Sequence, residues 1–540
     1  MRSWCLAIFA TVLACNLLAS SREIAWGDAH PMWDVADRIV QHGAIDIGTR
    51  WPDDIPAGRD GKTYGIAAIG CALVHVPGAA IAALMHRVAP SADGLVRPLA
   101  VHLAPSAEGA LAAVLFFLLL IDLGIGTRTA SICTAILAGA TTTAVYAHYA
   151  YADILQLACF LGLFRAAIRT SADPSRREAL WLGAWAGMLV NTKYVFAVSV
   201  AGAGALVAWS LWTRKADLKR AALWASAAGA PFVVLALVYN YARWGSPLST
   251  GYGPYLSAYF GGSIFDGAWG MLASPNKSAL LYSPPLVLAI AGMPAAFRAV
   301  PRLGRALLLM VAPTLLVYCT YRSWSGDYAW GPRYFVWAVP PLLVPIAWFV
   351  DRSSALPDGS AARSGKAGPF DRLTKLRRIA LVAIVALGVA VQLLGMALYW
   401  DHFIRIANDA KNQWLGQPNR RGAYIAERGR GHCDSCFEDT YELLWTPAFQ
   451  PIRGHLWLLE SLARGDDAKA AQTDAPWRTY TSLDVDIAST YARVRVDWWG
   501  LLWLRDFKDT RVLGAILMLI FAAGAALGVA RWIRMTRMRE

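Results

Sequence analysis

The chain has 540 residues, of which 56% are hydrophobic and only 16% are charged, and its mean hydropathy is +0.39. Globular domains carry about a quarter charged residues, so this composition excludes a soluble globular protein, a disordered chain, a coiled coil and a collagen. The 51 Lys and Arg exceed the 37 Asp and Glu, but the excess lies in short loops between apolar runs. That pattern indicates an integral membrane protein and argues against nucleic-acid binding.

Long apolar stretches predict twelve membrane-spanning helices, since about 20 apolar residues cross the hydrocarbon core as a helix. They lie at residues 4–21, 99–123, 129–148, 151–168, 179–191, 194–212, 219–240, 278–298, 305–321, 333–350, 378–399 and 512–532. We interpret the first stretch as an uncleaved span and not a secretory signal, because its apolar run continues past Cys15 to Ala19.

Clusters of basic residues follow the even-numbered spans. They lie within residues 169–177, 214–220, 298–305, 366–378 and 531–539. With Met1 in the cytoplasm all five fall on the cytoplasmic side, as the positive-inside rule requires.

A further apolar stretch, residues 64–88, would invert this parity if it crossed the membrane, so we predict juxtamembrane helices on the outer surface there. Pro77 and several glycines fit that interpretation. The alternative is that this stretch crosses and one of the spans within residues 179–212 does not.

This topology places four polar segments outside: residues 22–98, 241–277, 322–332 and 401–511. The predicted organisation is a membrane region over residues 1–400, with 22–98 as its first outer loop, an extracytoplasmic domain over 401–511, and a last helix with a basic tail over 512–540. Residues 484–499, DVDIASTYARVRVDWW, alternate in polarity as strands do. We therefore expect the extracytoplasmic domain to be small and mixed α/β.

Two of the eight cysteines, Cys433 and Cys436, lie in a polar run, HCDSC, at residues 432–436. His432 and Asp434 make a metal site one interpretation, but zinc sites ordinarily draw four ligands from separated pairs. A local disulfide in an oxidising outer compartment is the alternative that we favour.

The first outer loop contains WGDAHPMWDVADRIVQHGAIDI at residues 26–47. Asp28 follows the first span closely, and a carboxylate at a membrane surface can act as a general base towards a hydroxyl. The competing interpretation is that Asp28 caps the helix that begins near Pro31, with Asp34 and Asp37 on its wet face.

This loop resembles the first extracytoplasmic loop of GT-C membrane glycosyltransferases, the class that includes dolichyl-phosphate-mannose protein mannosyltransferases and bacterial polyprenyl-phosphate-sugar transferases. These enzymes place a catalytic Asp just after the first span, followed by an amphipathic helix and a turn similar to HGAIDI at residues 42–47. Ala29 stands where the family often has a second acid, which argues against a paired-carboxylate metal site. We predict that no cofactor is required, and a divalent metal ion stays open as the alternative.

Further blocks are similar to the family in the same order along the chain. They lie at residues 61–84, 148–157, 239–253, 272–285, 323–334, 446–459 and 496–503. The resemblance thus extends over nearly the whole chain, and it implies a GT-C fold with Asp153 as an acid at the outer start of a span.

A sugar transferase of this kind needs cations at headgroup depth for the leaving phosphate. Lys193, Lys277 and Arg333 lie at outer span ends, where the alternative role is snorkelling to interfacial water. Tyr64 and Tyr252 are candidates for stacking on a sugar. Asp327, in SWSGDYAWGPRY, is a further substrate-binding candidate.

The predicted function is transfer of one sugar from a polyprenyl-phosphate donor to a hydroxyl of a glycan, lipid or protein acceptor, with inversion at the anomeric carbon. The predicted location is the bacterial inner membrane, with the site facing the periplasm or cell exterior. Two alternatives stay open: a transporter or flippase for a lipid-linked glycan, and a catalytically inactive relative.

Overall fold

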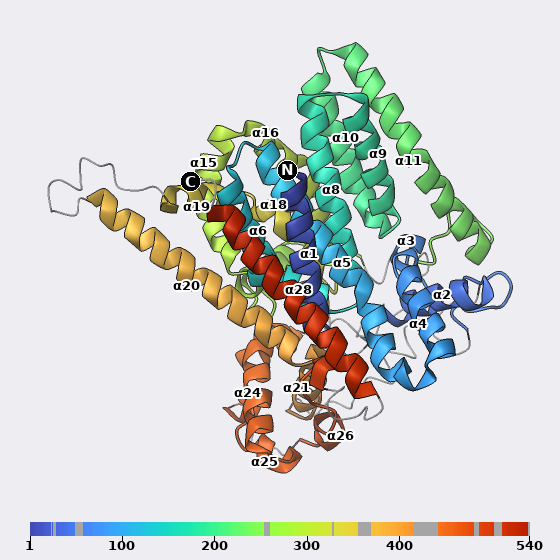
Figure 1. The fold of residues 1–540 in the computed structure, drawn as a ribbon, viewed down its shortest axis with the longest axis vertical. Coiled ribbons are helices and arrows are strands. Elements are labelled where there is room, and N and C mark those ends of the chain that lie inside the picture. The colour runs from blue at the N-terminus through green and yellow to red at the C-terminus, as the bar shows by residue number, and fades with distance from the viewer. Residues whose placement is uncertain are drawn as a thin grey trace.

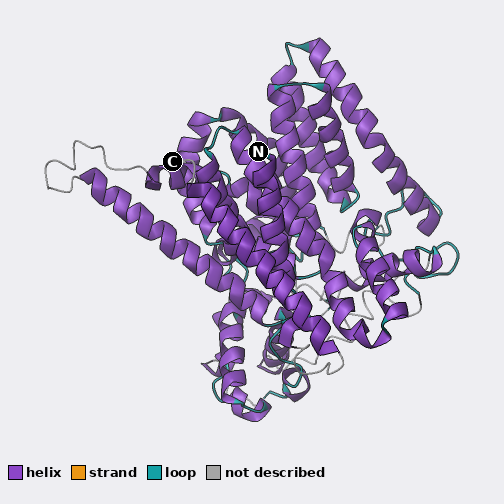
Figure 2. Cartoon of the chain, in the orientation of Figure 1, coloured by secondary structure: helices purple, strands orange, loops and turns teal. Residues whose placement is uncertain are grey.

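The chain folds into a bundle of helices (Figures 1 and 2). The computed structural model describes residues 1–22, 24, 29–48, 58–252, 260–326, 329–354, 369–414, 441–479, 485–501 and 510–537. The isolated bridges that join two residues of these ranges are Phe260 with Tyr321 and Leu398 with Val496, and no longer strand occurs within them. The prediction of a helical, multi-pass membrane protein is therefore confirmed for the described part of the chain.

Nine helical segments in the described ranges are long and apolar enough to cross a membrane. Five are single helices: α1 (Arg2–Ala19), α8 (Ala152–Ala172), α11 (Lys215–Trp244), α20 (Pro369–Ala397) and α28 (Arg511–Arg537). The other four combine consecutive helices: α3 (Ile69–Leu73) with α4 (Val76–Val88), η1 (Pro90–Ala92) with α5 (Asp93–Asp122), η2 (Tyr194–Phe196) with α10 (Ala197–Leu211), and α16 (Pro301–Ala306) with η4 (Leu307–Val311) and α17 (Ala312–Cys319).

The predicted number of twelve spans is not confirmed. The stretch at 129–148 is a bent pair, α6 (Thr127–Ala140) and α7 (Thr142–His148), which meet at 58° and would make a tenth span. The bend falls at Thr141, whose extended backbone ends α6 and whose hydroxyl accepts a hydrogen bond from the backbone of Thr143.

Three other predicted spans form helices too short to qualify alone. Residues 179–191 belong to the 15-residue α9 (Arg176–Val190), whose rise of about 22 Å is less than a bilayer core. Residues 278–298 form α14 (Ala279–Tyr282) and α15 (Pro285–Ala299), and residues 333–350 form η5 (Arg333–Ala338), α18 (Val339–Leu343) and α19 (Ile346–Ser354). Prolines lie at both breaks, Pro284 and Pro345, and proline lacks the N–H that would continue a helix.

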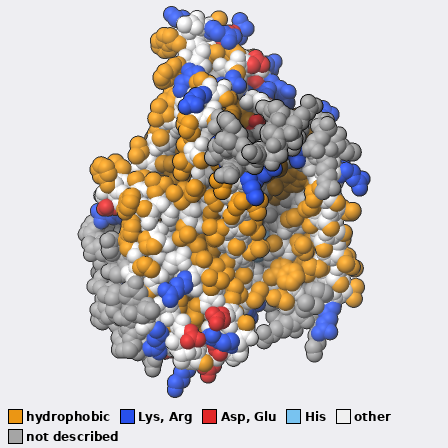
Figure 3. Space-filling view, turned by 90° about the vertical axis from the view of Figure 1, so that its left-hand side faces the viewer, with side chains coloured by type: hydrophobic (Ala, Val, Ile, Leu, Met, Phe, Trp, Pro, Cys, Tyr) orange, Lys and Arg blue, Asp and Glu red, His pale blue; other side chains and the backbone are white. Residues whose placement is uncertain are grey.

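The polar segments collect at two opposite ends of the bundle (Figure 1). Both chain termini, the α8–α9 and α10–α11 connections and α16 lie towards one end, and α2 (Ala29–His42), α4, α21 (Trp400–Trp414) and α24 (Pro451–Arg464) lie towards the other. This is the segregation that the basic loops predict. Figure 3 shows hydrophobic side chains over the broad middle of one face, with charged groups gathered mainly near its two ends.

The α/β prediction for residues 401–511 is not confirmed, since the described part of this region forms helices. Besides α21 and α24 these are α23 (Tyr441–Trp445), η8 (Pro447–Phe449), α25 (Ala468–Gln472), η9 (Pro476–Thr479) and α26 (Ala488–Tyr491). The alternating stretch after residue 484 contains α26 and contributes one bridge residue, Val496, to a partner at Leu398. Polarity alternates there because Val485, Ile487 and Val494 are buried against neighbouring helices, and not because a strand pairs with another strand.

Candidate functional site

Asp153 and Arg333, which are 180 residues apart in the sequence, form an ion pair at the starts of two helical segments. The Nε of Arg333 donates to Oδ2 of Asp153 over 2.8 Å, and the side chains are only 12% and 4% exposed. Asp153 lies in the first turn of α8, where the helix dipole favours a negative charge, and Arg333 begins η5. The structure therefore brings together a predicted catalytic acid and a predicted phosphate-binding cation.

Aromatic rings surround this pair. The guanidinium of Arg333 lies 4.6 Å from the ring centroid of Tyr151 and 5.9 Å from that of Tyr334. Tyr334 in turn stacks on Tyr318, with ring centroids 5.1 Å apart and an interplanar angle of 10°. Arginine binds well over such ring faces because the π-electrons stabilise its charge.

Lys193 joins the same group through these rings. Its Nζ lies 4.4 Å from the ring centroid of Tyr334 and 5.4 Å from that of Tyr318. Lys193 precedes η2, in the short connection between α9 and α10. Two of the predicted cations, Lys193 and Arg333, thus share one aromatic wall.

Lys277 lies deeper, with 3% of its surface exposed, and its Nζ donates to the carbonyl oxygens of Ala329 and Gly331. Those carbonyls belong to the loop that leads into Arg333. Gly331 adopts a positive φ of 69° there, a conformation that favours glycine. Through these contacts Lys277 holds the loop in place. The sequence predicted Lys277 only as a residue that contacts the phosphate.

Tyr64 and Tyr252 lie in the chain segments that follow α2 and α11. The hydroxyl of Tyr64 donates to Oδ2 of Asp60 over 3.0 Å. Burial and the neighbouring Asp60 carboxylate raise the pKa of Tyr64 to about 12, so this phenol stays neutral at physiological pH. Tyr252 is half-buried, and its backbone N–H donates to the Thr250 hydroxyl.

Two predicted acids, Asp28 and Asp327, lie outside the described residues, as do His432, Cys433, Asp434 and Cys436. Their predicted roles and the predicted disulfide stay predictions. Among the described residues no group of three or more His, Cys, Asp or Glu side chains is placed to hold a metal ion.

Asp497 is a buried polar centre that the sequence reasoning missed. Its carboxylate, 2% exposed, accepts hydrogen bonds from the Ser21 hydroxyl at 2.8 Å, the Arg22 backbone at 3.2 Å and the Tyr149 hydroxyl at 2.6 Å. Its own backbone N–H donates to the carbonyl of Ala397. Asp497 therefore joins the residues that follow α1 to Tyr149, which shortly precedes α8. In the sequence these two segments come just before the candidate catalytic acids Asp28 and Asp153.

The indoles that follow Asp497 cap the same helix end. Nε1 of Trp498 donates to the Leu18 carbonyl over 2.6 Å, and Nε1 of Trp499 donates to the Leu17 carbonyl over 3.0 Å. The last carbonyls of a helix have no partner within it, so these contacts satisfy groups that would otherwise be exposed near the membrane. In the sequence the VDWW block at residues 496–499 identified this segment, but it did not indicate the role of Asp497.

Arg243 is a second buried centre that was not predicted. Its guanidinium, with no exposed surface, donates to the carbonyls of Gly65 and Ala67 and to Oδ1 of Asn240, and it lies 3.9 Å from the Tyr239 ring centroid. It fastens the C-terminal end of α11 to the stretch of chain at residues 65–67 that leads into α3.

The arrangement has the parts that binding of a phosphate at headgroup depth requires. Cations beside aromatic rings can hold an anion, and the rings can contact the apolar or sugar part of an amphiphile. The carboxylate of Asp153, which binds Arg333, lies beside these cations and rings. The fold and these residues together describe a helical membrane protein with a polar, cation-containing site at the end of its bundle that carries α2, α4 and the α21–α26 helices.

Comparisons with protein families and with curated proteins found no match. Among solved structures, the chain is similar to the crystal structure of ArnT from Cupriavidus metallidurans bound to undecaprenyl phosphate, with 15% identity, a TM-score of 0.46, and coverage of 85% of this chain and 78% of that one. The apo form of the same ArnT gives 15% identity, a TM-score of 0.43 and the same coverages.

Proposed function

We propose that the chain is a GT-C-type glycosyltransferase, which transfers one sugar from a polyprenyl-phosphate donor to an acceptor hydroxyl. The observation that carries the proposal is the grouping of Asp153, Arg333 and Lys193 around Tyr334 at the end of the bundle that carries α2. We place that end on the periplasmic or exterior side of a bacterial inner membrane, because the basic connections lie at the other end.

In the proposed reaction Asp28 takes the proton of the acceptor hydroxyl. The acceptor oxygen then attacks the anomeric carbon from the face opposite the phosphate, and the bond to the phosphate oxygen breaks with its electron pair staying on that oxygen. The products are an inverted glycoside and a polyprenyl phosphate. Arg333 and Lys193 stabilise the negative charge that develops on the departing phosphate, a charge that is costly in a low-dielectric site.

Asp153 acts in this proposal by orienting Arg333. An Arg–carboxylate hydrogen bond of 2.8 Å fixes the plane of the guanidinium and leaves less rotamer freedom to lose when phosphate binds. Lys277 supports the same group indirectly, because its bonds to Ala329 and Gly331 hold the loop that positions Arg333. The donor sugar and the acceptor are not specified by these contacts.

One observation favours the competing class, a transporter of a lipid-linked glycan. Glu108 lies inside α5 with 7% exposure, and its Oε1 has no hydrogen-bond partner among the described residues. Ionisable groups within spans often mark substrate or proton pathways. A transporter would move a labelled lipid-linked sugar across the bilayer and leave its glycosidic bond intact.

The test uses the purified chain in proteoliposomes with a radiolabelled pool of polyprenyl-phosphate sugars and a membrane extract as the source of acceptors. The proposal predicts that label moves from the lipid donor to an acceptor fraction, and that Arg333→Ala abolishes most of the transfer. Arg405→Ala is the matched control, since Arg405 also forms a part-buried ion pair, with Asp401, at the same end of the bundle. Label that crosses the bilayer on an intact donor would instead establish the transporter.

A further inference from the structure

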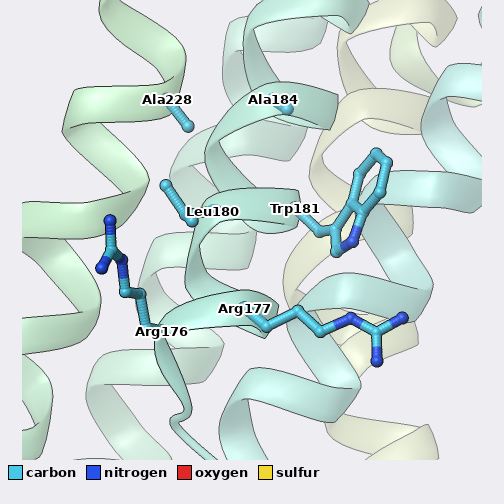
Figure 4. Close-up of a pocket in the computed structure, with 6 residues that line it drawn as sticks. All are labelled: Arg176, Arg177, Leu180, Trp181, Ala184 and Ala228. Atoms are coloured by element: carbon cyan, nitrogen blue, oxygen red, sulfur yellow. The ribbon is translucent and has the colours of Figure 1, made fainter.

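A hollow of about 560 Å³ opens between α9 and α11 (Figure 4). Its lining residues are Arg176, Arg177, Leu180, Trp181, Ala184 and Ala228. Asp153 and this hollow lie at opposite ends of α8, whose 21 residues rise about 30 Å. The hollow therefore lies at the basic end of the bundle.

Small residues create this hollow. α9 and α11 approach so closely that a Cβ on Gly183 would lie 1.9 Å from the carbonyl oxygen of Ala225. Beside that contact Ala184 and Ala228 are too short to fill the space between the helices. Trp181, which is 50% exposed, forms a wall of the resulting apolar slot.

Two arginines lie at the mouth of the slot, both in the first turn of α9. The guanidinium of Arg176 stacks on Trp224 of α11 at 4.0 Å, which holds one positive charge against the neighbouring helix. Arg177 is exposed and forms no ion pair among the described residues. The acid that follows it, Glu178, is already paired with Arg169, so it does not neutralise the mouth.

The start of α11 adds further positive charge at this end, from Lys215, Lys219 and Arg220. Along the same helix large apolar side chains face outwards, Leu223 at 63% and Val238 at 59% exposure. The exposed apolar side chains of this helix pair suit the acyl chain of an anionic amphiphile, and the cations at its end suit the negatively charged headgroup. A soluble phosphate would not use the slot, and a neutral lipid would not use the arginines.

We infer that the slot between α9 and α11 binds an anionic phospholipid, with its phosphate at Arg176, an acyl chain along Leu180, Ala184 and Ala228, and Arg177 adding positive charge at the same end of α9. The site lies in the cytoplasmic leaflet if the basic loops are cytoplasmic. It is independent of the proposed transferase activity, since none of its residues belongs to the group around Arg333.

The test is photo-crosslinking of the full-length chain in phosphatidylcholine nanodiscs that contain a phosphatidylglycerol with a diazirine in its acyl chain. Crosslinks should map to the α9 and α11 peptides. The double change Arg176→Ala and Arg177→Ala should weaken apparent affinity about 25-fold, since each basic residue near a lipid headgroup contributes roughly a five-fold factor. The double change to lysine should retain most of the binding.

Controls separate the slot from general surface charge. Arg298→Ala with Arg305→Ala removes two charges at the same end of the bundle and should leave the crosslinks unchanged. Ala184→Leu fills the slot while keeping both arginines, and it should reduce the acyl-chain crosslinks. Equal labelling by a photoactivatable phosphatidylcholine, an unchanged yield in the double alanine variant, or displacement of the lipid by millimolar glycerol 3-phosphate would each overturn the inference.

Discussion

Removal of the Arg333 side chain tests two roles of this residue, the stabilising ion pair with Asp153 and the proposed contact with the donor phosphate. Arg333→Ala leaves Asp153, 4% exposed, without the guanidinium that binds its Oδ2 at 2.8 Å. Breaking a buried ion pair by deleting one partner typically costs about 3 to 5 kcal/mol of stability. The 12% exposure of Arg333 places the expected loss near the lower value, so the variant should fold but unfold at a lower temperature.

The effect on donor binding should be separate from this loss of stability. A hydrogen bond to a charged group contributes about 1.5 to 3 kcal/mol, so loss of the Arg333–phosphate contact should weaken donor affinity roughly 10- to 150-fold. Arg333→Lys should recover only part of this, because an ammonium lacks the planar pair of donors that a guanidinium offers.

Asp153→Asn combined with Arg333→Ala distinguishes the roles. The double variant has no stranded carboxylate, so its stability should recover towards that of the wild type, whereas its donor affinity should stay low. Donor affinity is measured by equilibrium binding of a labelled polyprenyl phosphate in nanodiscs, and stability by thermal unfolding of the same samples. Wild-type donor affinity in the double variant would refute the assignment, because Arg333 would then only neutralise Asp153.

Three other predictions test parts of the account. Cysteines introduced at the exposed Ser91 and at the exposed Ala470 should react with an impermeant reagent from the same side of the membrane, and opposite accessibility would contradict the loop-charge parity. Cys433 and Cys436 should be found joined by mass spectrometry without reduction, whereas a stoichiometric metal that is lost on Cys433→Ser would contradict the disulfide. Burial lowers the pKa of His455 to about 4, below the 6.5 of an exposed His. Between pH 7.5 and pH 5 the unfolded state therefore takes up a proton that the folded state does not, which should lower the free energy of unfolding by about 2 kcal/mol. His455→Gln should remove this loss when unfolding is measured at both pH values.

Hydropathy and charge predicted the membrane architecture well because they depend on local composition. Each apolar stretch is helical, and the basic connections gather at one end as the positive-inside pattern requires. The predicted number of spans was not confirmed where proline interrupts apolar runs, as at Pro284 and Pro345. Hydropathy is averaged over a window and does not register that proline lacks the backbone N–H. The strands expected near residue 490 were not confirmed. Alternating polarity indicates alternating burial, which a short helix flanked by loops can also produce.

The candidate site was predictable in its residue types and not in its pairings. The resemblance of residues 148–157 to GT-C enzymes identified Asp153, and a cation at a predicted outer span end identified Arg333. That the two bind each other follows from the way α8 and η5 pack. Asp497 was missed for a related reason. Its partners at Ser21 and Tyr149 are 476 and 348 residues away in the sequence, so no local pattern reports them.

The most direct test of the central claim is single-turnover sugar transfer by the purified chain in nanodiscs, measured with wild type, Asp28→Asn and the control Asp37→Asn in the same loop. Asparagine keeps the size of aspartate but cannot take the acceptor proton, so Asp28→Asn should lower the rate of transfer by about 10² to 10⁴ with donor affinity little changed, whereas Asp37→Asn should transfer at nearly the wild-type rate. Near-normal transfer by Asp28→Asn would move the base to Asp34, Asp153 or Asp327, and a wild-type chain that binds the lipid-linked sugar but leaves every glycosidic bond intact would contradict the account as a whole.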